Sequence, residues 1–259
     1  MKKSETDLIE IKERLIDEIN SGKHASYQSL SPRLQSLLGN VEYSPNSRFE
    51  SQRFDYIKSK VSFTNKKVID IGCNMGYFTL SSLDEGAAHV TAYEGVKNHA
   101  EFVHNASNLL DVSSKLIVHN HYFNFNESDC HYDIAILLNV LHHVGDDYGD
   151  PALTIEGARQ LIIEQLNGMA RFADMVCFQL GFNWRGNRNY GLFENGTKKE
   201  LIEFIKKGIE HIWRIDCIGI ARKDSGDRVR YDDLNNENIK RNDGLGEFLN
   251  RPIFILSKL

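Results

Sequence analysis

The segment from Lys66 to Thr79, KKVIDIGCNMGYFT, constrains the fold of this chain more than any other part of its sequence. An apolar stretch in this segment contains the acidic residue Asp70, and small or conformationally permissive residues follow at alternate positions: Gly72, Asn74 and Gly76. Such residues let the backbone turn sharply and approach a ligand closely. The segment therefore predicts a strand, a tight turn and the start of a helix, whose N-terminal backbone amides can bind a small ligand.

The turn does not fit two common nucleotide-binding loops. A dinucleotide fingerprint aligned on Gly72 needs glycine at positions occupied by Asn74 and Tyr77, and a P-loop needs Gly-Lys-Ser/Thr at the helix start. The loop instead resembles motif I of the class I (Rossmann-like) S-adenosylmethionine (SAM) methyltransferases, an acidic residue followed by x-Gly-x-Gly-x-Gly. The resemblance implies that the following residues bind the cofactor: Asp70, Gly72, Cys73, Asn74, Gly76, Tyr77 and Phe78.

Two later segments fit the same family. Residues 88–94 form an apolar stretch that ends in Glu94, about 20 positions after the glycine loop, where a carboxylate can accept hydrogen bonds from ribose hydroxyls. Residues 132–144, YDIAILLNVLHHV, resemble motif IV, and the resemblance places Asn139 near the methionine part of SAM. The three motifs together predict SAM as cofactor and S-adenosylhomocysteine as product, and they cover roughly residues 50–180.

The residues after the expected third strand depart from the family pattern. Many members carry an acidic residue there that contacts the adenine amino group, whereas this chain has none before Glu127. The resemblance then assigns the adenine to backbone groups, Asn120 or His121, with Tyr122 or Phe123 packing on the ring. The histidines of this segment have no cysteine or aspartate cluster beside them, so the sequence predicts no metal site.

The order of the expected elements predicts an α/β fold. Strand and helix patterns alternate, which favours a doubly wound seven-stranded sheet with helices on both faces, and the family resemblance makes the last strand antiparallel. We expect an N-terminal helical cap over residues 1–62, a SAM-binding core over 63–259 and a polar insertion near 221–249. Strands are expected at 66–71, 88–93, 115–119, 132–138, 173–180, 211–219 and 252–258, and helices at 4–21, 31–38, 47–60, 76–85, 96–109, 151–169 and 197–208.

Composition limits the partners. The net charge of −5 disfavours a dedicated nucleic-acid binder, which usually has a basic surplus, but it does not exclude RNA, because a local basic groove can coexist with an acidic total. No stretch of about 20 apolar residues is present, so no membrane span is expected. The start of the chain lacks the apolar core of a signal peptide, and the four scattered cysteines fit reduced thiols, which together predict a cytoplasmic protein. Both a monomer and a homodimer remain open, because the amphipathic helix at 4–21 can pack on its own core or on a partner subunit.

Two histidines follow the fourth strand at the position where a catalytic base is expected. Methyl transfer from a sulfonium is an in-line displacement, so the protein supplies alignment and a base where the acceptor must lose a proton. His142 and His143 are the candidates, because a histidine that titrates near neutral pH suits this role. His143 is marginally favoured, and the alternative is that one of the two packs under the sheet.

The segment after the fifth strand, residues 179–196, is rich in glycine, asparagine, arginine and aromatic residues, which is typical of a substrate-binding loop. Arginines there can hold a phosphate or carboxylate, and aromatic rings can pack on a sugar or a methylated ammonium. The alternative is a surface loop whose arginines are solvated. The predicted substrate residues are Gln179, Trp184, Arg185, Arg188 and Tyr190, with Arg48 and Arg53 from the cap.

Three functions remain at this point. The first is SAM-dependent O- or N-methylation of a small polar metabolite, phosphorylated or sugar-like, because the order of motifs loosely resembles bacterial methyltransferases of surface-polysaccharide pathways. The second is RNA modification, since tRNA-modifying enzymes share a related core. The third is a catalytically inactive SAM-fold subunit that binds a partner, against which the intact glycine loop and Glu94 argue.

Overall fold

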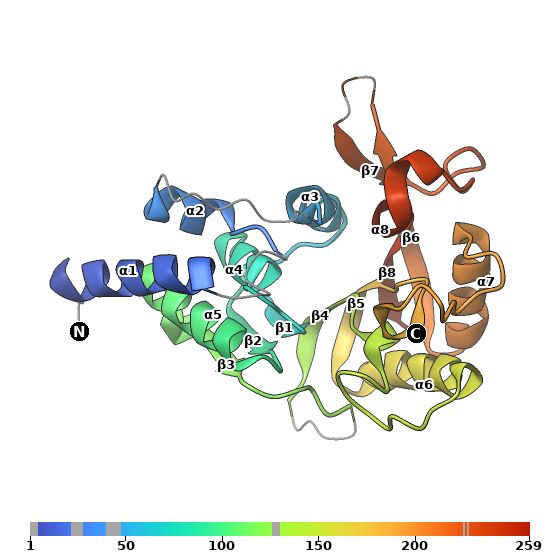
Figure 1. Ribbon diagram of the computed structural model, residues 1–259, viewed down its shortest axis with the longest axis horizontal. Coiled ribbons are helices and arrows are strands. Elements are labelled where there is room, and N and C mark those ends of the chain that lie inside the picture. Colours follow the sequence, from blue (N-terminus) through green and yellow to red (C-terminus); the bar gives the residue numbers. More distant parts are fainter. Residues whose placement is uncertain (1–4, 22–27, 40–47, 126–129, 225, 227) are drawn as a thin grey trace. The chain divides into compact units, whose positions relative to one another are not determined.

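The computed structural model describes residues 5–21, 28–39, 48–125, 130–224, 226 and 228–259, so Glu127 and short parts of the predicted cap and insertion lie outside the described residues. Figure 1 shows the helices and strands of the chain, and contacts within the chain divide it into two compact units. The first unit comprises residues 1–54 and 62–123, and the second comprises residues 55–61 and 124–259.

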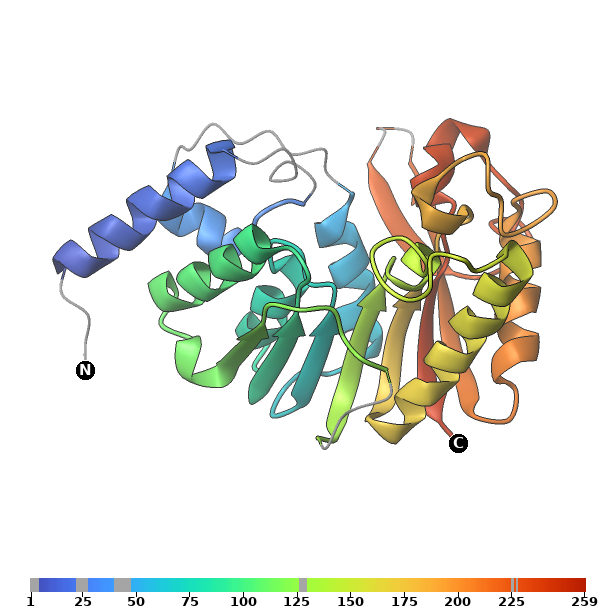
Figure 2. The same ribbon diagram turned by 60° about the horizontal axis from the view of Figure 1, so that its bottom comes forward.

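The first unit contains three parallel strands in the order β3-β2-β1. Four of the five residues of the first strand are buried, as expected for a strand covered on both faces. The helices between the strands are the crossover connections that parallel pairing requires (Figure 2). The elements are β1 (Lys67–Ile71), α4 (Tyr77–Asp84), β2 (His89–Tyr93), α5 (Lys97–Leu109) and β3 (Leu116–His119).

Helices α1 (Glu5–Ser21) and α2 (Pro32–Leu38) also pack within the first unit. Leu15 and Leu34 are fully buried in one apolar cluster together with Phe102 of α5 and Met75 of the glycine loop. The amphipathic helix therefore packs on its own chain. The third helix, α3 (Glu50–Lys60), begins in the first unit and ends in the second.

The second unit contains a mixed sheet with the strand order β4-β5-β8-β6-β7. The first two strands are parallel, and β8 runs antiparallel to both β5 and β6, which confirms the predicted antiparallel last strand. The elements are β4 (Tyr132–Leu138), α6 (Ile155–Gly168), β5 (Ala173–Gln179), α7 (Lys198–Ile209), β6 (Trp213–Lys223), β7 (Val229–Asp233), α8 (Gly246–Leu249) and β8 (Ile253–Lys258).

The α/β fold class is confirmed, but the number of strands was underestimated because the described residues form eight rather than seven. The extra strand, β7, lies in the polar insertion and forms an antiparallel hairpin with β6, which itself ends four residues later than expected. Val229 and Tyr231 alternate with polar residues along β7 and are buried, and the Tyr231 ring lies 6.1 Å from that of Tyr56. Two buried side chains among polar neighbours give too weak a period-two signal to predict a strand.

Helix ends follow local capping chemistry. The Thr197 side chain accepts a hydrogen bond from the backbone N–H of Glu200, and the Glu200 carboxylate accepts one from the backbone N–H of Thr197, so the two residues form a capping box. Helix α6 begins at Ile155, four residues later than predicted, because Thr154 is its N-cap and accepts from Gly157 N. Within the described part of the chain, no helix combines the length and apolarity needed to cross a membrane.

Candidate functional site

The loop from β1 to α4 has the conformation that its residue types predicted. Gly72, Asn74 and Gly76 adopt positive φ angles of 73°, 52° and 77°. The Asn74 side chain accepts a hydrogen bond from Met75 N at 2.8 Å, so this residue stabilises the left-handed turn that glycine usually makes. A Cβ atom at Gly76 would lie 2.8 Å from a methyl group of Val103, so close packing as well as the φ angle requires glycine there.

Asp70, at the end of β1, is a buried carboxyl group. It is 2 % exposed and accepts a hydrogen bond of 2.6 Å from the Thr79 hydroxyl. Burial raises the pKa of Asp70 to about 7, and the nearby charge of Glu94 adds to the rise. This group therefore changes its protonation close to neutral pH.

Glu94, at the end of β2, connects the glycine loop to the second strand. Its Oε2 atom accepts a hydrogen bond from Asn74 N at 2.8 Å, and its Oε1 atom accepts one from Val96 N at 2.9 Å. Each carboxylate oxygen can accept a further hydrogen bond, because an ionised carboxylate offers about four lone-pair sites. The backbone thus holds the carboxylate in one orientation, as a group that binds a diol must be held.

Aromatic rings gather at the carboxyl ends of β2 and β3. The Tyr93 and His119 rings stack with their centroids 4.5 Å apart, and those of His121 and Phe123 lie 5.4 and 5.0 Å from Tyr93. A Cβ atom at Gly95 would lie 2.3 Å from the ring of Tyr122, so that ring lies directly over the backbone next to Glu94.

This arrangement places the flat faces of aromatic rings beside Glu94, the candidate ribose ligand, and such a surface suits a purine. Asn120 donates from Nδ2 to the carbonyl oxygen of Glu94 at 3.2 Å and thereby fixes the loop that carries these rings.

The two arginines predicted in the cap differ in environment. Arg53 is 4 % exposed; its Nε donates to the carbonyl oxygen of Arg48, its Nη2 lies 3.6 Å from Glu50 Oε1, and its guanidinium lies 4.9 Å from the centre of the Phe78 ring. Arg48 is exposed. A substrate contact of Arg53 stays a prediction, since these contacts already give it a structural role.

A contact that the sequence did not predict involves Gln28. This residue is buried, and its Oε1 atom accepts a hydrogen bond of 3.0 Å from Tyr77 N, the first amide of α4. The segment before α2 therefore satisfies one of the amides that a helix N-terminus leaves open. No local sequence signal links two residues that are 49 positions apart.

In the second unit, a polar network surrounds Asn139 at the end of β4. Asn139 has a φ of 62°; it donates from Nδ2 to Gln179 Oε1 at 2.9 Å and accepts at Oδ1 from Arg251 Nη1 at 2.8 Å. Arg251 forms two further hydrogen bonds with Glu247, of 3.0 and 2.7 Å, and its carbonyl oxygen accepts from Gln179 Nε2. The sequence predicted Asn139 and Gln179 but missed Arg251, which holds both.

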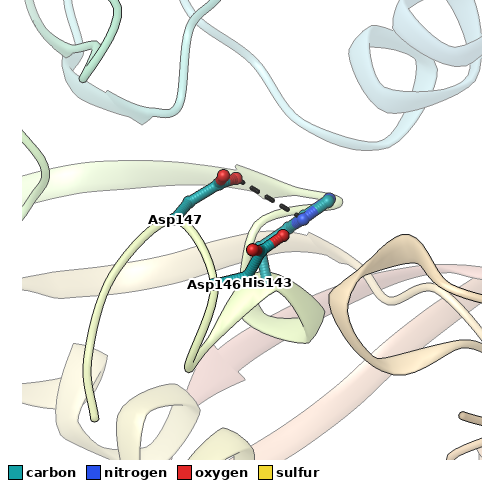
Figure 3. Close-up of side chains that lie close together, drawn as sticks. All are labelled: His143, Asp146 and Asp147. Carbon is teal, nitrogen blue, oxygen red and sulfur yellow. Dashed lines mark ion pairs between the residues drawn. The ribbon is translucent and has the colours of Figure 1, made fainter. Parts of the chain in front are cut away.

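The two adjacent histidines after β4 have different environments. His142 is 2 % exposed and its Nδ1 accepts a hydrogen bond from Gly181 N at 3.3 Å. The His143 side chain is 32 % exposed, and its Nδ1 lies 3.4 Å from Asp147 Oδ2 (Figure 3). His142 thus packs in the interior, whereas His143 is accessible and oriented by a carboxylate. His143, Asp146 and Asp147 together offer three possible metal-ligand atoms within 4.8 Å of one another.

The loop after β5 is fixed to the turn that follows β4. Trp184 donates from Nε1 to Val144 O at 2.6 Å, and Arg185 donates from Nη2 to Pro151 O at 2.6 Å. The Arg185 guanidinium also lies 4.2 Å from the centre of the Trp184 ring, while its buried Nε has no hydrogen-bond partner among the described residues. Arg188 and Tyr190, farther along the loop, are exposed. The loop therefore has a fixed base and an exposed tip.

Comparison with known proteins is informative about the fold. No family model and no curated protein sequence matches this chain. Among solved structures, a proposed RNA methyltransferase from Pyrococcus horikoshii matches with a TM-score of 0.51 and 15 % identity, over 96 % of this chain and 99 % of that one. WbdD matches with a TM-score of 0.53 and 14 % identity, over 94 % of this chain but 46 % of that one.

A proposed haemolysin from Streptococcus thermophilus also matches, with a TM-score of 0.50 and 13 % identity, over 85 % of this chain and 68 % of that one. Identities this low show the fold alone. The fold is that of the class I methyltransferases, as the sequence motifs indicated. The different names of these proteins show that the fold does not decide the acceptor.

Proposed function

We propose that this protein is a SAM-dependent methyltransferase whose first unit binds SAM. The observation that carries the proposal is the Glu94 carboxylate, which is hydrogen-bonded to the amide of Asn74 in the glycine loop and keeps lone pairs for a ribose diol. The left-handed conformations of the loop and the rings beside Gly95 support it, because they leave a narrow backbone turn and flat surface for a nucleoside.

His143 is the proposed general base of the reaction. SAM, when bound, supplies a methyl group already activated by the sulfonium, so the remaining task for the protein is to orient the acceptor and take its proton. Asp147 lies 3.4 Å from His143 Nδ1 and favours the imidazolium that forms when Nε2 takes a proton. His142 is proposed to be structural, because its Nδ1 already accepts from Gly181 N.

The proposed acceptor is a small polar metabolite that carries a phosphate, a carboxylate or a sugar, methylated on oxygen or nitrogen. Arg185 supports this proposal because its buried Nε lacks a hydrogen-bond partner within the described ranges, so the guanidinium keeps an unused donor. Arg188 and Tyr190, exposed at the tip of the same loop, add a cation and a ring. A role in a cytoplasmic step of surface-polysaccharide synthesis fits such an acceptor.

Calorimetry with SAM and S-adenosylhomocysteine tests the cofactor. We expect micromolar binding to the wild type and at least a tenfold loss of affinity in Glu94→Gln. This substitution keeps the shape of the side chain but removes the negative charge that accepts hydrogen bonds from the ribose hydroxyls. Glu101→Gln, an exposed carboxylate on α5, is the matched control and should bind as the wild type does. Absence of binding to the wild type would refute the proposal.

RNA methylation is the second candidate, because one protein of the same fold is a proposed RNA methyltransferase. The acidic net charge of −5 argues against it. A gel shift with tRNA at rising salt separates the two: binding that weakens steeply with salt would favour RNA. Methyl transfer to phosphorylated alcohols, amines or nucleotide sugars would favour the small metabolite. SAM binding without transfer to either class would favour an inactive binding subunit.

A further inference from the structure

The first unit contains a histidine that the motifs did not indicate. His99 lies in the first turn of α5, five residues after Glu94, and is 6 % exposed. Its backbone N–H donates to Val96 O at 3.1 Å, which fixes its position at the start of the helix. Its Nδ1 atom is buried and has no hydrogen-bond partner in the part of the chain that the structure describes. A buried ring nitrogen without a partner costs about 1–3 kcal/mol, so this atom requires an explanation.

The Nδ1 atom of His99 lies 3.8 Å from Glu94 Oε1. This distance is too long for a direct hydrogen bond, whose usual N···O range ends near about 3.2 Å. Glu94 cannot shift toward the ring without losing its bonds to the amides of Asn74 and Val96, both shorter than 3 Å. The fixed separation instead leaves the carboxylate and the imidazole beside one another, each able to contact the same small polar group.

A hydroxyl group fits this pair. It donates its hydrogen to the carboxylate, which can only accept, and its lone pairs accept a hydrogen from the imidazole. An ammonium can only donate, so it cannot accept from the imidazole N–H, and a phosphate would be repelled by Glu94. The pair therefore selects hydroxyl-bearing ligands, and a vicinal diol can occupy both groups with its two oxygens.

We propose that His99 is a second positioning residue for the ribose diol, and that it binds one hydroxyl together with Glu94. The inference rests on the proposed function, because it takes the ribose of SAM as the diol. It adds that recognition of the ribose depends on helix α5 as well as on the end of β2. His99 would then discriminate between ribose and deoxyribose forms of the cofactor.

The test asks whether the His99 side chain and one ribose hydroxyl contribute to the same interaction. S-adenosylhomocysteine and its 2′-deoxy and 3′-deoxy analogues are titrated into the wild type, His99→Asn and His99→Leu. Asn places a polar atom near the position of Nδ1, whereas Leu has a similar shape without one. We expect His99→Leu to weaken the binding of S-adenosylhomocysteine three- to tenfold, and His99→Asn to keep most of the wild-type affinity. For one of the two deoxy analogues, His99→Leu should bind as tightly as the wild type does. His104→Leu, an exposed histidine on the same helix, is the control.

The outcomes separate this inference from the proposed function. If the wild type does not bind S-adenosylhomocysteine, the proposed function fails and the inference fails with it. If the wild type binds but the loss in His99→Leu is equal for all three ligands, or Asn behaves as Leu does, only the role of His99 is refuted. If His99→Leu does not fold, ¹⁵N-histidine NMR of the wild type decides: the Nδ1 resonance must shift on adding S-adenosylhomocysteine and shift less with one deoxy analogue.

Discussion

Replacement of Asp70 by asparagine should make the protein more stable at neutral pH. Asp70 is fully enclosed at the end of β1, and its pKa is raised from 3.8 to about 7 because burial disfavours the charged form. The asparagine side chain has nearly the same shape and can still accept the hydrogen bond from the Thr79 hydroxyl. The substitution therefore removes the charge and keeps the packing.

The magnitude follows from proton linkage. Below pH 3.8 the carboxyl is protonated in the folded and unfolded chains alike. Between pH 3.8 and about 7 the unfolded chain releases its proton while the folded chain retains it, so the free energy of unfolding falls by about 1.4 kcal/mol per pH unit. Above about pH 7 both forms are ionised and the loss is constant, at about 4 kcal/mol. Asp70→Asn should be free of this loss.

Urea unfolding at pH 5, 6, 7 and 8 measures the effect. The stability advantage of Asp70→Asn over the wild type should grow by roughly 3 kcal/mol between pH 5 and 7 and then level off. Asp111→Asn is the control, because Asp111 is exposed in the same unit and has a φ of 57°, which asparagine also tolerates. An advantage that stays constant with pH, or that is shared by the control, would show that Asp70 does not carry a buried charge.

Three further substitutions test contacts in the second unit by urea unfolding. Arg251→Met removes the hydrogen bonds from the buried guanidinium to Asn139 and Glu247 and should cost about 1–3 kcal/mol; a neutral result would mean that these bonds do not stabilise the fold. Gly181→Ala places a Cβ atom 2.7 Å from the His142 ring and should cost about 1–3 kcal/mol, unless that ring can move freely. Thr197→Ala removes the capping box of α7 and should cost about 1 kcal/mol, and no loss would contradict the cap.

Features that depend on local sequence were predictable. The residues of β4 were predicted without error because residues 132–138 are apolar except for Asp133 and are bounded by His131 and Asn139. The capping box at Thr197 was predictable because both of its partners lie within four residues. The left-handed turn at Asn74 follows from residue type alone.

Features that depend on distant contacts were not predictable. Arg251 meets Asn139 across 112 positions of sequence, and nothing near either residue indicates the pairing. His99 lacks a motif of its own, and only its burial next to Glu94 makes it a candidate. The same limit applies to Arg53, which was predicted as a substrate residue of the cap and is buried beside Glu50 in the structure.

In the loop after β5, the residues that anchor the loop are different from the residues that are exposed at its tip. Its two ends are joined by hydrogen bonds from Trp184 N to Tyr190 O and from Leu192 N to Phe182 O, each 2.8 Å long, and Trp184 also anchors its base. The exposed stretch 186–190 makes none of the anchoring side-chain bonds. Substitutions at the exposed residues 187–190 should cost little stability. Under the proposed function, a lineage could therefore acquire new acceptors by exchanging this tip alone, while the fold and the cofactor site stay unchanged.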